Sequence, residues 1–111
     1  MENLEAVIFQ IILHGGNARS AAMEAMHAAK QGDFKGAKDK LKESANALNE
    51  AHRIQTSLIQ GEVRGEKNEI SLLMIHAQDH LMNAMTVKEL VAEMVDLYQR
   101  FQLSGRETME E

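Results

Sequence analysis

Apolar residues recur every three or four positions along most of this 111-residue chain, which is the spacing of one face of an α-helix. In the first segment this pattern runs up to the stretch KQGDF at residues 30–34. Its apolar members are Leu4, Val7, Ile8, Ile11, Ile12, Ala18, Ala21, Ala22, Ala25, Met26 and Ala29. Gly32 is a natural helix stop, and Asp33 can cap a following helix. The pattern therefore predicts a first helix that ends before Gly32.

Two further segments show the same spacing. The second runs from the cap at Asp33 to the stretch QGEVRGEKN at residues 60–68, where two glycines and mixed charges predict a loop. Its stripe consists of Phe34, Ala37, Leu41, Ala45, Leu48, His52, Gln55 and Leu58. The third is predicted to begin near Asn68, which can cap it, and to run to about Phe101. Three long helices joined by short connections predict an up-down-up antiparallel three-helix bundle.

Composition agrees with an all-α fold in a single domain. Proline is absent, aromatic residues make up 4%, and residues that lose little freedom in a helix dominate. A chain of this length builds one hydrophobic core and not two. We assign residues 1–102 to the helical domain and predict that residues 103–111 form a disordered polar tail.

The third segment carries apolar residues on two faces. At about 100° per residue, one face collects the residues expected in the core of the bundle, namely Ile70, Leu73, Met74, Ala77, Leu81, Ala84, Val91 and Val95. A second band on nearly the opposite side consists of Leu72, Ile75, Asp79, Met82, Thr86 and Leu90. A monomeric bundle would leave this second band in water. It therefore predicts a homo-oligomer with the band at its symmetry axis.

Asp79 lies in the middle of this band. Like carboxylates brought together around an axis repel one another, so they must protonate, take in water or bind a cation. Oxygen ligands suit a hard divalent ion such as Mg²⁺. The alternative is that Asp79 is a solvated surface carboxylate beside incidental apolar residues.

Charge and composition exclude several functional classes. The chain carries 12 basic and 17 acidic residues, a net charge of −5, and no basic cluster, so we expect no nucleic-acid partner. Its apolar runs are too short to cross a bilayer, and the N-terminal stretch MENLEAVIFQIILHGG lacks the features of a secretory signal. The absence of cysteine removes thiolate chemistry. We expect a cytoplasmic protein without direct membrane insertion.

The stretch MIHAQDHLMNAM at residues 74–85 holds the candidate chemistry. His76 falls between the two faces of its helix, where a side chain is held by packing and still reaches solvent. Neutral imidazole is a competent nucleophile, and on phosphorylation it forms a labile N–P bond. His80, one turn later and nearer the core face, is expected to support it, and Gln78 points in a third direction, where an adjacent subunit can receive it.

Other interpretations of these residues stay open on spacing alone. His76 and His80 have the i, i+4 spacing of a zinc pair, but no glutamate follows the first histidine and no third ligand is evident. The histidines can also be plain structural or surface residues; the five are His14, His27, His52, His76 and His80. Gly15 and Gly16 lie inside the first predicted helix, where glycine is costly. They indicate either close approach to another helix or to a phosphate-bearing partner, or a kink or a break between two shorter helices.

The chain through about Arg100 resembles the lactose/cellobiose-type IIA component of the bacterial sugar phosphotransferase system. Three stretches carry the resemblance: HGGNARSAAMEAMHAAKQGDF, LNEAHRIQTSLIQGE and, most specifically, HAQDHLMNAM. The resemblance implies that His76 is the phosphorylated residue. It also implies that Asp79 binds a divalent ion shared by three subunits, each a three-helix bundle, in a nine-helix trimer.

The resemblance further implies a reaction and its partners. Phospho-HPr would donate a phosphoryl group to His76, which would pass the group to a cysteine of a IIB component during sugar uptake. The quoted stretches look more similar to the cellobiose, chitobiose and lichenan types than to the lactose type. The alternative is a non-catalytic trimeric scaffold or regulator that keeps the bundle without phosphotransfer.

Overall fold

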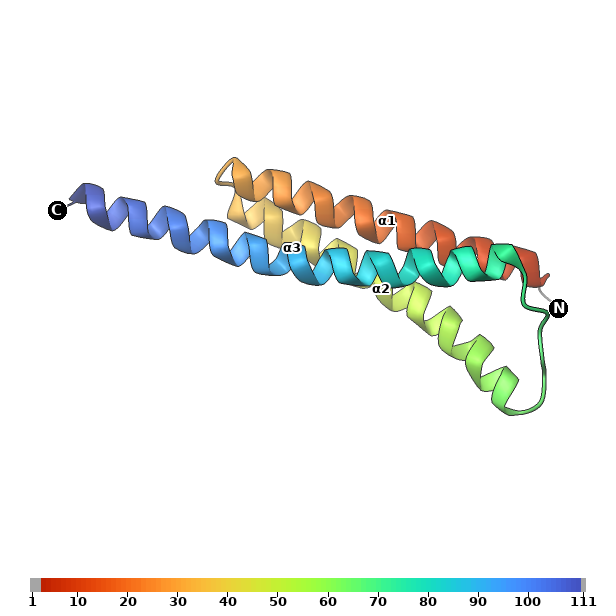
Figure 1. Ribbon diagram of the computed structural model, residues 1–111. Coiled ribbons are helices and arrows are strands. Elements are labelled where there is room, and N and C mark those ends of the chain that lie inside the picture. Colours follow the sequence, from red (N-terminus) through yellow and green to blue (C-terminus); the bar gives the residue numbers. More distant parts are fainter. Residues whose placement is uncertain (1–2, 111) are drawn as a thin grey trace.

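The chain folds into three long α-helices that run antiparallel to their neighbours in sequence (Figure 1). The computed structural model describes the backbone of residues 3–110 and the side chains of residues 3–105. Helix α1 spans Leu4–Lys30, α2 spans Phe34–Val63 and α3 spans Leu72–Glu110, and the described residues contain no strand. This confirms the prediction of an all-α, up-down-up three-helix fold.

Glycine ends both α1 and α2 in the same way. Gly32 and Gly65 have φ of 82° and 95°, and each directly follows the C-cap residue of its helix, Gln31 or Arg64. The amide of the next residue, Asp33 or Glu66, donates to a carbonyl five residues earlier at 2.9 Å in both cases, which satisfies a carbonyl at the helix end. The predicted stop at Gly32 is confirmed.

The predicted cap at Asp33 is also confirmed, because its Oδ1 accepts the amide hydrogen of Gly36 at 2.9 Å. The C-terminal end of α2 and both ends of α3 differ from the prediction. Helix α2 continues past Leu58 and through Gly61 to Val63, because a single glycine weakens a helix without ending it.

Helix α3 begins later and ends later than its sequence pattern indicated. It starts at Leu72, not at Asn68, because Ser71 provides the cap: its Oγ accepts the amide hydrogen of Met74 at 3.1 Å. It continues from Phe101 to Glu110, since Gly105 alone weakens the helix without ending it. The assignment of residues 103–111 to a disordered tail stays a prediction, and Glu111 lies outside the described residues.

Two clusters of buried residues hold the bundle together. One contains Ile8, Ile11, Ala51, Ile54, Ala77 and Leu81; the other contains Ala22, Ala25, Ala29, Ala37, Val91 and Val95. Each cluster draws on all three helices, and α1 contacts both partners more extensively than α2 and α3 contact each other. The first cluster lies directly behind the candidate site, so α1 and α3 meet there over a closely packed core.

The predicted core faces were correct for α1 and for most of α3. Ile70 is an exception: it lies in the connection before α3 and is exposed. On α2 the buried face includes Ala51, Ile54 and Ser44, whereas His52, which was predicted on the core stripe, is exposed. Ser44 is fully buried, and its hydroxyl donates to the carbonyl oxygen of Ala18 at 2.7 Å. This hydrogen bond offsets the cost of burying the hydroxyl group.

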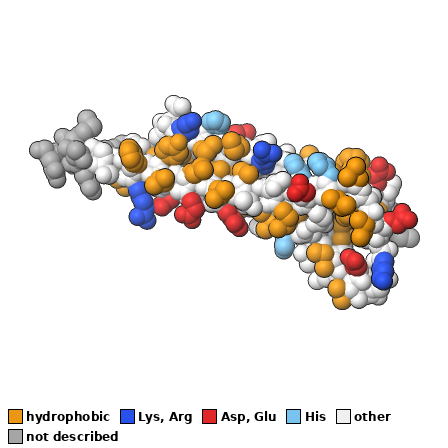
Figure 2. Space-filling model, viewed as in Figure 1, with side chains coloured by type: hydrophobic (Ala, Val, Ile, Leu, Met, Phe, Trp, Pro, Cys, Tyr) orange, Lys and Arg blue, Asp and Glu red, His pale blue; other side chains and the backbone are white. Residues whose placement is uncertain are grey.

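The second band of α3 faces solvent in the single chain, as its sequence pattern indicated. Leu72 is 83% exposed, Ile75 54%, Met82 52% and Leu90 55%. Further exposed apolar residues extend along the C-terminal half of α3, including Met94, Leu97 and Phe101, and hydrophobic side chains gather there in Figure 2. The homo-oligomer itself stays a prediction. Within the described residues, no helix combines the length and the apolar character that a membrane span requires.

Candidate functional site

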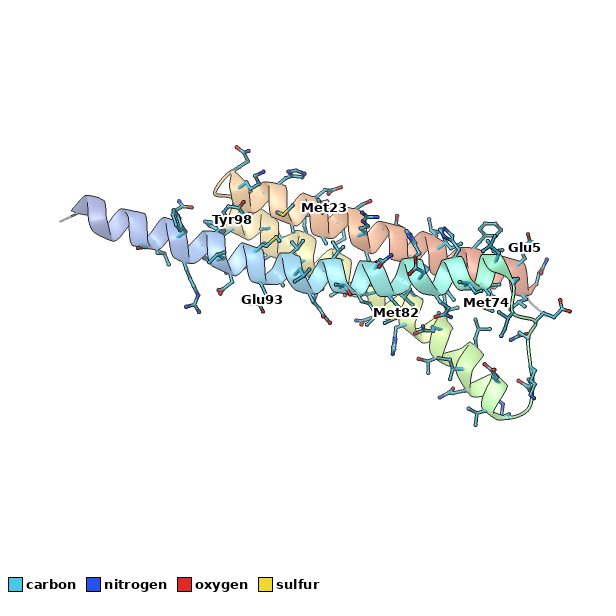
Figure 3. The ribbon with its side chains drawn as sticks, viewed as in Figure 1. Glu5, Met23, Met74, Met82, Glu93 and Tyr98 are labelled. Atoms are coloured by element: carbon cyan, nitrogen blue, oxygen red, sulfur yellow. The ribbon has the colours of Figure 1, made fainter. Side chains whose placement is uncertain are left out.

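The candidate residues lie in the second and third turns of α3, where this helix passes alongside α1 (Figure 1). Figure 3 shows Met74, just before these residues, at the same end of the bundle as Glu5 of α1, whereas Tyr98 lies near the end where α1 and α2 meet. Successive residues of a helix point about 100° apart. His76, Gln78 and Asp79 therefore leave α3 in different directions, and each meets different surroundings.

His76 is exposed. Among the side chains and backbone that the structure describes, its ring has no hydrogen-bond partner. Its imidazole stacks on that of His80, with ring centroids 5.9 Å apart and ring planes 21° from parallel. A ring nitrogen that is solvent-accessible and not engaged in a hydrogen bond keeps its lone pair available for attack on an electrophile.

His80 is half-buried and packs against α1. It lies beside Gly15 and Gly16, which have no side chains to exclude it: a Cβ atom built on Gly15 would lie 3.3 Å from His80 Cδ2, and one built on Gly16 would lie 3.4 Å from His80 Nε2. The sequence left the purpose of the glycine pair open between close approach and a kink. Helix α1 runs through the pair without a break, and the short distances to His80 show that the pair allows close approach of α3.

Gln78 lies on another side of α3. Its Oε1 accepts a hydrogen bond from Nε2 of Gln55 on α2, within the same chain. The sequence placed Gln78 in a direction where a neighbouring subunit can receive it, whereas here Gln55 of the same chain provides its partner. The contribution of Gln55 was not predicted, because the pattern of α2 marks it only as a member of the core stripe.

Asp79 is exposed in the middle of the second band. The only hydrogen bond found for its carboxylate in the described residues comes from Nδ2 of Asn83, at 3.4 Å. No group of three or more His, Cys, Asp or Glu side chains that would hold a metal ion occurs within the described part of one chain. A single chain thus contributes one carboxylate, and the predicted shared Mg²⁺ ion stays a prediction.

Within the described residues, the other three histidines make no ring contact with His76 or His80. His14 is half-buried on α1, next to Gly15. His27 and His52 are exposed on α1 and α2, and the ring contact of His76 is with His80. Because the described residues offer no third ligand beside this pair, the zinc interpretation gains no support from the geometry. What the arrangement does offer is one accessible imidazole with a second imidazole held beside it.

A sequence model of the family described as "PTS system, Lactose/Cellobiose specific IIA subunit" matches residues 6–99. The chain belongs to this family. The match includes His76, Asp79 and the Gly15–Gly16 pair, so the IIA-family domain covers the whole candidate site. IIA components are parts of a phosphotransferase system, and the candidate site presents an exposed histidine.

Relatives in the IIA family are closely similar in sequence. The chain is 61% identical over 99 residues to the lichenan-specific phosphotransferase enzyme IIA component of Bacillus subtilis (strain 168), covering 89% of this chain and 90% of that protein. It is 46% identical over 99 residues to the N,N'-diacetylchitobiose-specific EIIA component of Escherichia coli (strain K12), covering 89% and 85%.

Solved structures of IIA proteins show the same fold. The crystal structure of the cellobiose-specific enzyme IIA from Bacillus anthracis superposes with a TM-score of 0.88 at 56% identity, covering 93% of this chain and 95% of that one. The solution structure of the IIA(Chitobiose)–HPr complex from Escherichia coli gives a TM-score of 0.81 at 44% identity, covering 92% and 99%.

Proposed function

We propose that this protein is a phosphocarrier that accepts a phosphoryl group from phospho-HPr on His76 and passes it to a cysteine of a IIB component. The observation that carries the proposal is the exposed imidazole of His76, in the third helix of a IIA-family fold. Within the described residues this ring makes no hydrogen bond. A relative at 44% identity has been solved as a complex with HPr, which supports HPr as the donor.

The two transfers use the same lone pair. In the first, a ring nitrogen of His76 attacks the phosphorus, a new N–P bond forms, and the electron pair of the broken N–P bond returns to the donor histidine. In the second, a cysteine thiolate of IIB attacks, an S–P bond forms, and the electron pair returns to His76. The reaction needs positioning and stabilisation of charge on the phosphoryl oxygens, and no redox partner.

We further propose that the chain works as a homotrimer with the second band of α3 at its axis. Leu72, Ile75, Met82 and Leu90 are all exposed, which supports this proposal, because a cluster of exposed apolar side chains on one helix face is unfavourable in water. Three Asp79 carboxylates would then meet at the axis. They would hold a hard divalent ion such as Mg²⁺, which would neutralise their mutual repulsion.

The sugar is proposed from the relatives. Their names specify lichenan, N,N'-diacetylchitobiose and cellobiose, all of which contain β-linked sugars. We propose a β-linked disaccharide of the cellobiose, chitobiose or lichenan type in preference to lactose. A transport assay with the cognate membrane component and each labelled sugar tests this choice.

The central experiment uses Enzyme I, HPr and labelled phosphoenolpyruvate. We expect label on the wild-type protein and none on the His76→Gln variant, and we expect the label to pass on to a IIB component but not to its Cys→Ser variant. His52→Gln is the matched control, because His52 is an exposed histidine on α2 that makes no ring contact with His76 or His80 in the described residues. An unlabelled wild-type protein would contradict the proposal and favour a non-catalytic scaffold.

A further inference from the structure

The Gly15–Gly16 pair lies in the middle of α1, where glycine is unfavourable. Both residues are inside an unbroken helix of 27 residues, and neither has a positive φ; the described glycines that do are Gly32 and Gly65. Backbone conformation therefore does not require glycine at either position, and alanine would stabilise the helix. The reason for the pair has to be steric.

The space beside the two glycines is filled mainly by the ring of His80. At Gly16, the contact that an added Cβ would make is with Nε2 of His80, at 3.4 Å. At Gly15, an added Cβ would meet Cδ2 of His80 at 3.3 Å and the Cα of Leu81 at 3.7 Å. Gly15 thus also lets the backbones of α1 and α3 approach each other, whereas Gly16 faces only the imidazole.

The position of the His80 ring matters because of its neighbour. The rings of His76 and His80 stack with centroids 5.9 Å apart. If the His80 ring were pushed away from α1, its position relative to the reacting nitrogen of His76 would change. A phosphoryl group on His76 carries its charge on oxygens that extend beyond the ring. A hydrogen-bond donor fixed in advance beside these oxygens stabilises the transfer, and displacement by about 1 Å removes much of that benefit.

We propose that Gly15 and Gly16 are positioning residues for phosphotransfer: they leave space for the His80 imidazole beside His76, so that a ring N–H of His80 donates to a phosphoryl oxygen. This inference rests on the proposed function of His76. The glycine pair touches neither the phosphoryl group nor its donor in this scheme and acts only through His80.

The test replaces Gly16 with side chains of increasing size. Gly16→Ala places a methyl group at the limit of ordinary contact with Nε2, and we expect a several-fold lower kcat for phosphorylation by phospho-HPr. Gly16→Val adds two methyl groups that displace the ring, and we expect a loss of about 100-fold in kcat with little change in KM. Both variants should keep the fold, because alanine and valine are better than glycine in a helix.

Gly105→Ala and Gly105→Val are the matched controls. Gly105 is also a helical glycine, it lies near the C-terminal end of α3, and an added Cβ there would meet nothing within 4 Å. These variants should transfer phosphate at the wild-type rate. A loss of activity in the controls as large as that in the Gly16 variants would overturn the inference, since helix composition alone would then explain the effect.

A double-mutant cycle separates positioning from packing. In a His80→Ala background, Gly16→Val should cause no further loss beyond about twofold, because the ring that it displaces is already absent. An undiminished 100-fold loss in that background would show that Gly16 acts on the partner or on helix packing, and would overturn the inference.

Imidazole NMR signals give a readout that does not depend on activity. In histidine-labelled protein, the Gly16→Val variant should show shifted ring signals of His80 and His76 relative to the wild type, with those of His27 and His52 unchanged. Unchanged His80 signals would overturn the inference. If the wild-type protein is never phosphorylated but the His80 signals respond as expected, the proposed function fails while the contact between the glycine pair and His80 stands.

Discussion

Replacing Leu90 with aspartate should dissociate the proposed trimer. Leu90 belongs to the second band of α3 and is 55% exposed in the single chain, so about half of its side chain is available for burial between subunits. Complete burial of a leucine contributes about 1.5–3 kcal/mol, which makes the available half worth about 1 kcal/mol per subunit and about 3 kcal/mol per trimer.

That loss corresponds to a decrease of about 100-fold in the association constant of the trimer. Because three chains combine, the concentration at half-assembly varies as the inverse square root of this constant, so it should rise at least about tenfold. The three new carboxylates at the axis add desolvation and repulsion to this minimum. Sedimentation equilibrium over a wide concentration range measures the shift directly.

Leu103→Asp is the matched control for this change. Leu103 lies on the same helix and is 52% exposed, but it points roughly 140° away from Leu90 around α3. Its substitution should leave the assembly unchanged. A wild-type protein that stays monomeric at high concentration would refute the reasoning, and so would a Leu90→Asp variant that remains a trimer at the concentrations where the wild type does.

Three further substitutions test the axis and the core. Asp79→Leu should preserve or strengthen the trimer and abolish binding of the divalent ion, because it replaces clustered charge with apolar packing. Native mass spectrometry measures both the number of subunits and the bound ion. Dissociation to monomers would contradict the account of the axial carboxylates. Ser44→Ala removes a buried hydrogen bond to Ala18 and should lower the free energy of unfolding by about 1 kcal/mol in urea titrations, an expectation that fails if stability rises. Leu81→Ala creates a cavity behind the site and should lower that free energy by about 2–5 kcal/mol. A cost for Leu81→Ala no larger than that of Leu103→Ala would count against its place in the core.

Local features of the fold were predictable from the sequence. The ends of helices depend on residues next to one another in the chain, which is why Gly32 and Asp33 were assigned correctly. Where two residues compete for the same role, the pattern is less decisive. Asn68 and Ser71 are both good caps, and it is Ser71 that binds the amide of Met74.

The two faces of α3 were also evident from the sequence, because a helical wheel depends only on spacing. The placement of Ala77 and Leu81 in the core, and of Ile75 and Met82 on the outer band, follows from 100° per residue. So does the position of His76 between these faces. The likeness of HAQDHLMNAM to the IIA family then singled out this histidine among five, which spacing alone did not do.

Contacts between helices were decided only by the tertiary structure. Gln55 and Gln78 are 23 positions apart, and their hydrogen bond depends on how α2 packs beside α3. The sequence marked Gly15 and Gly16 as unusual, but their partner became visible only when α1 was placed against the ring of His80. Spacing along one helix fixes the direction in which a side chain leaves that helix. What the side chain meets depends on the relative position and rotation of another helix, which only the packing of the whole core determines.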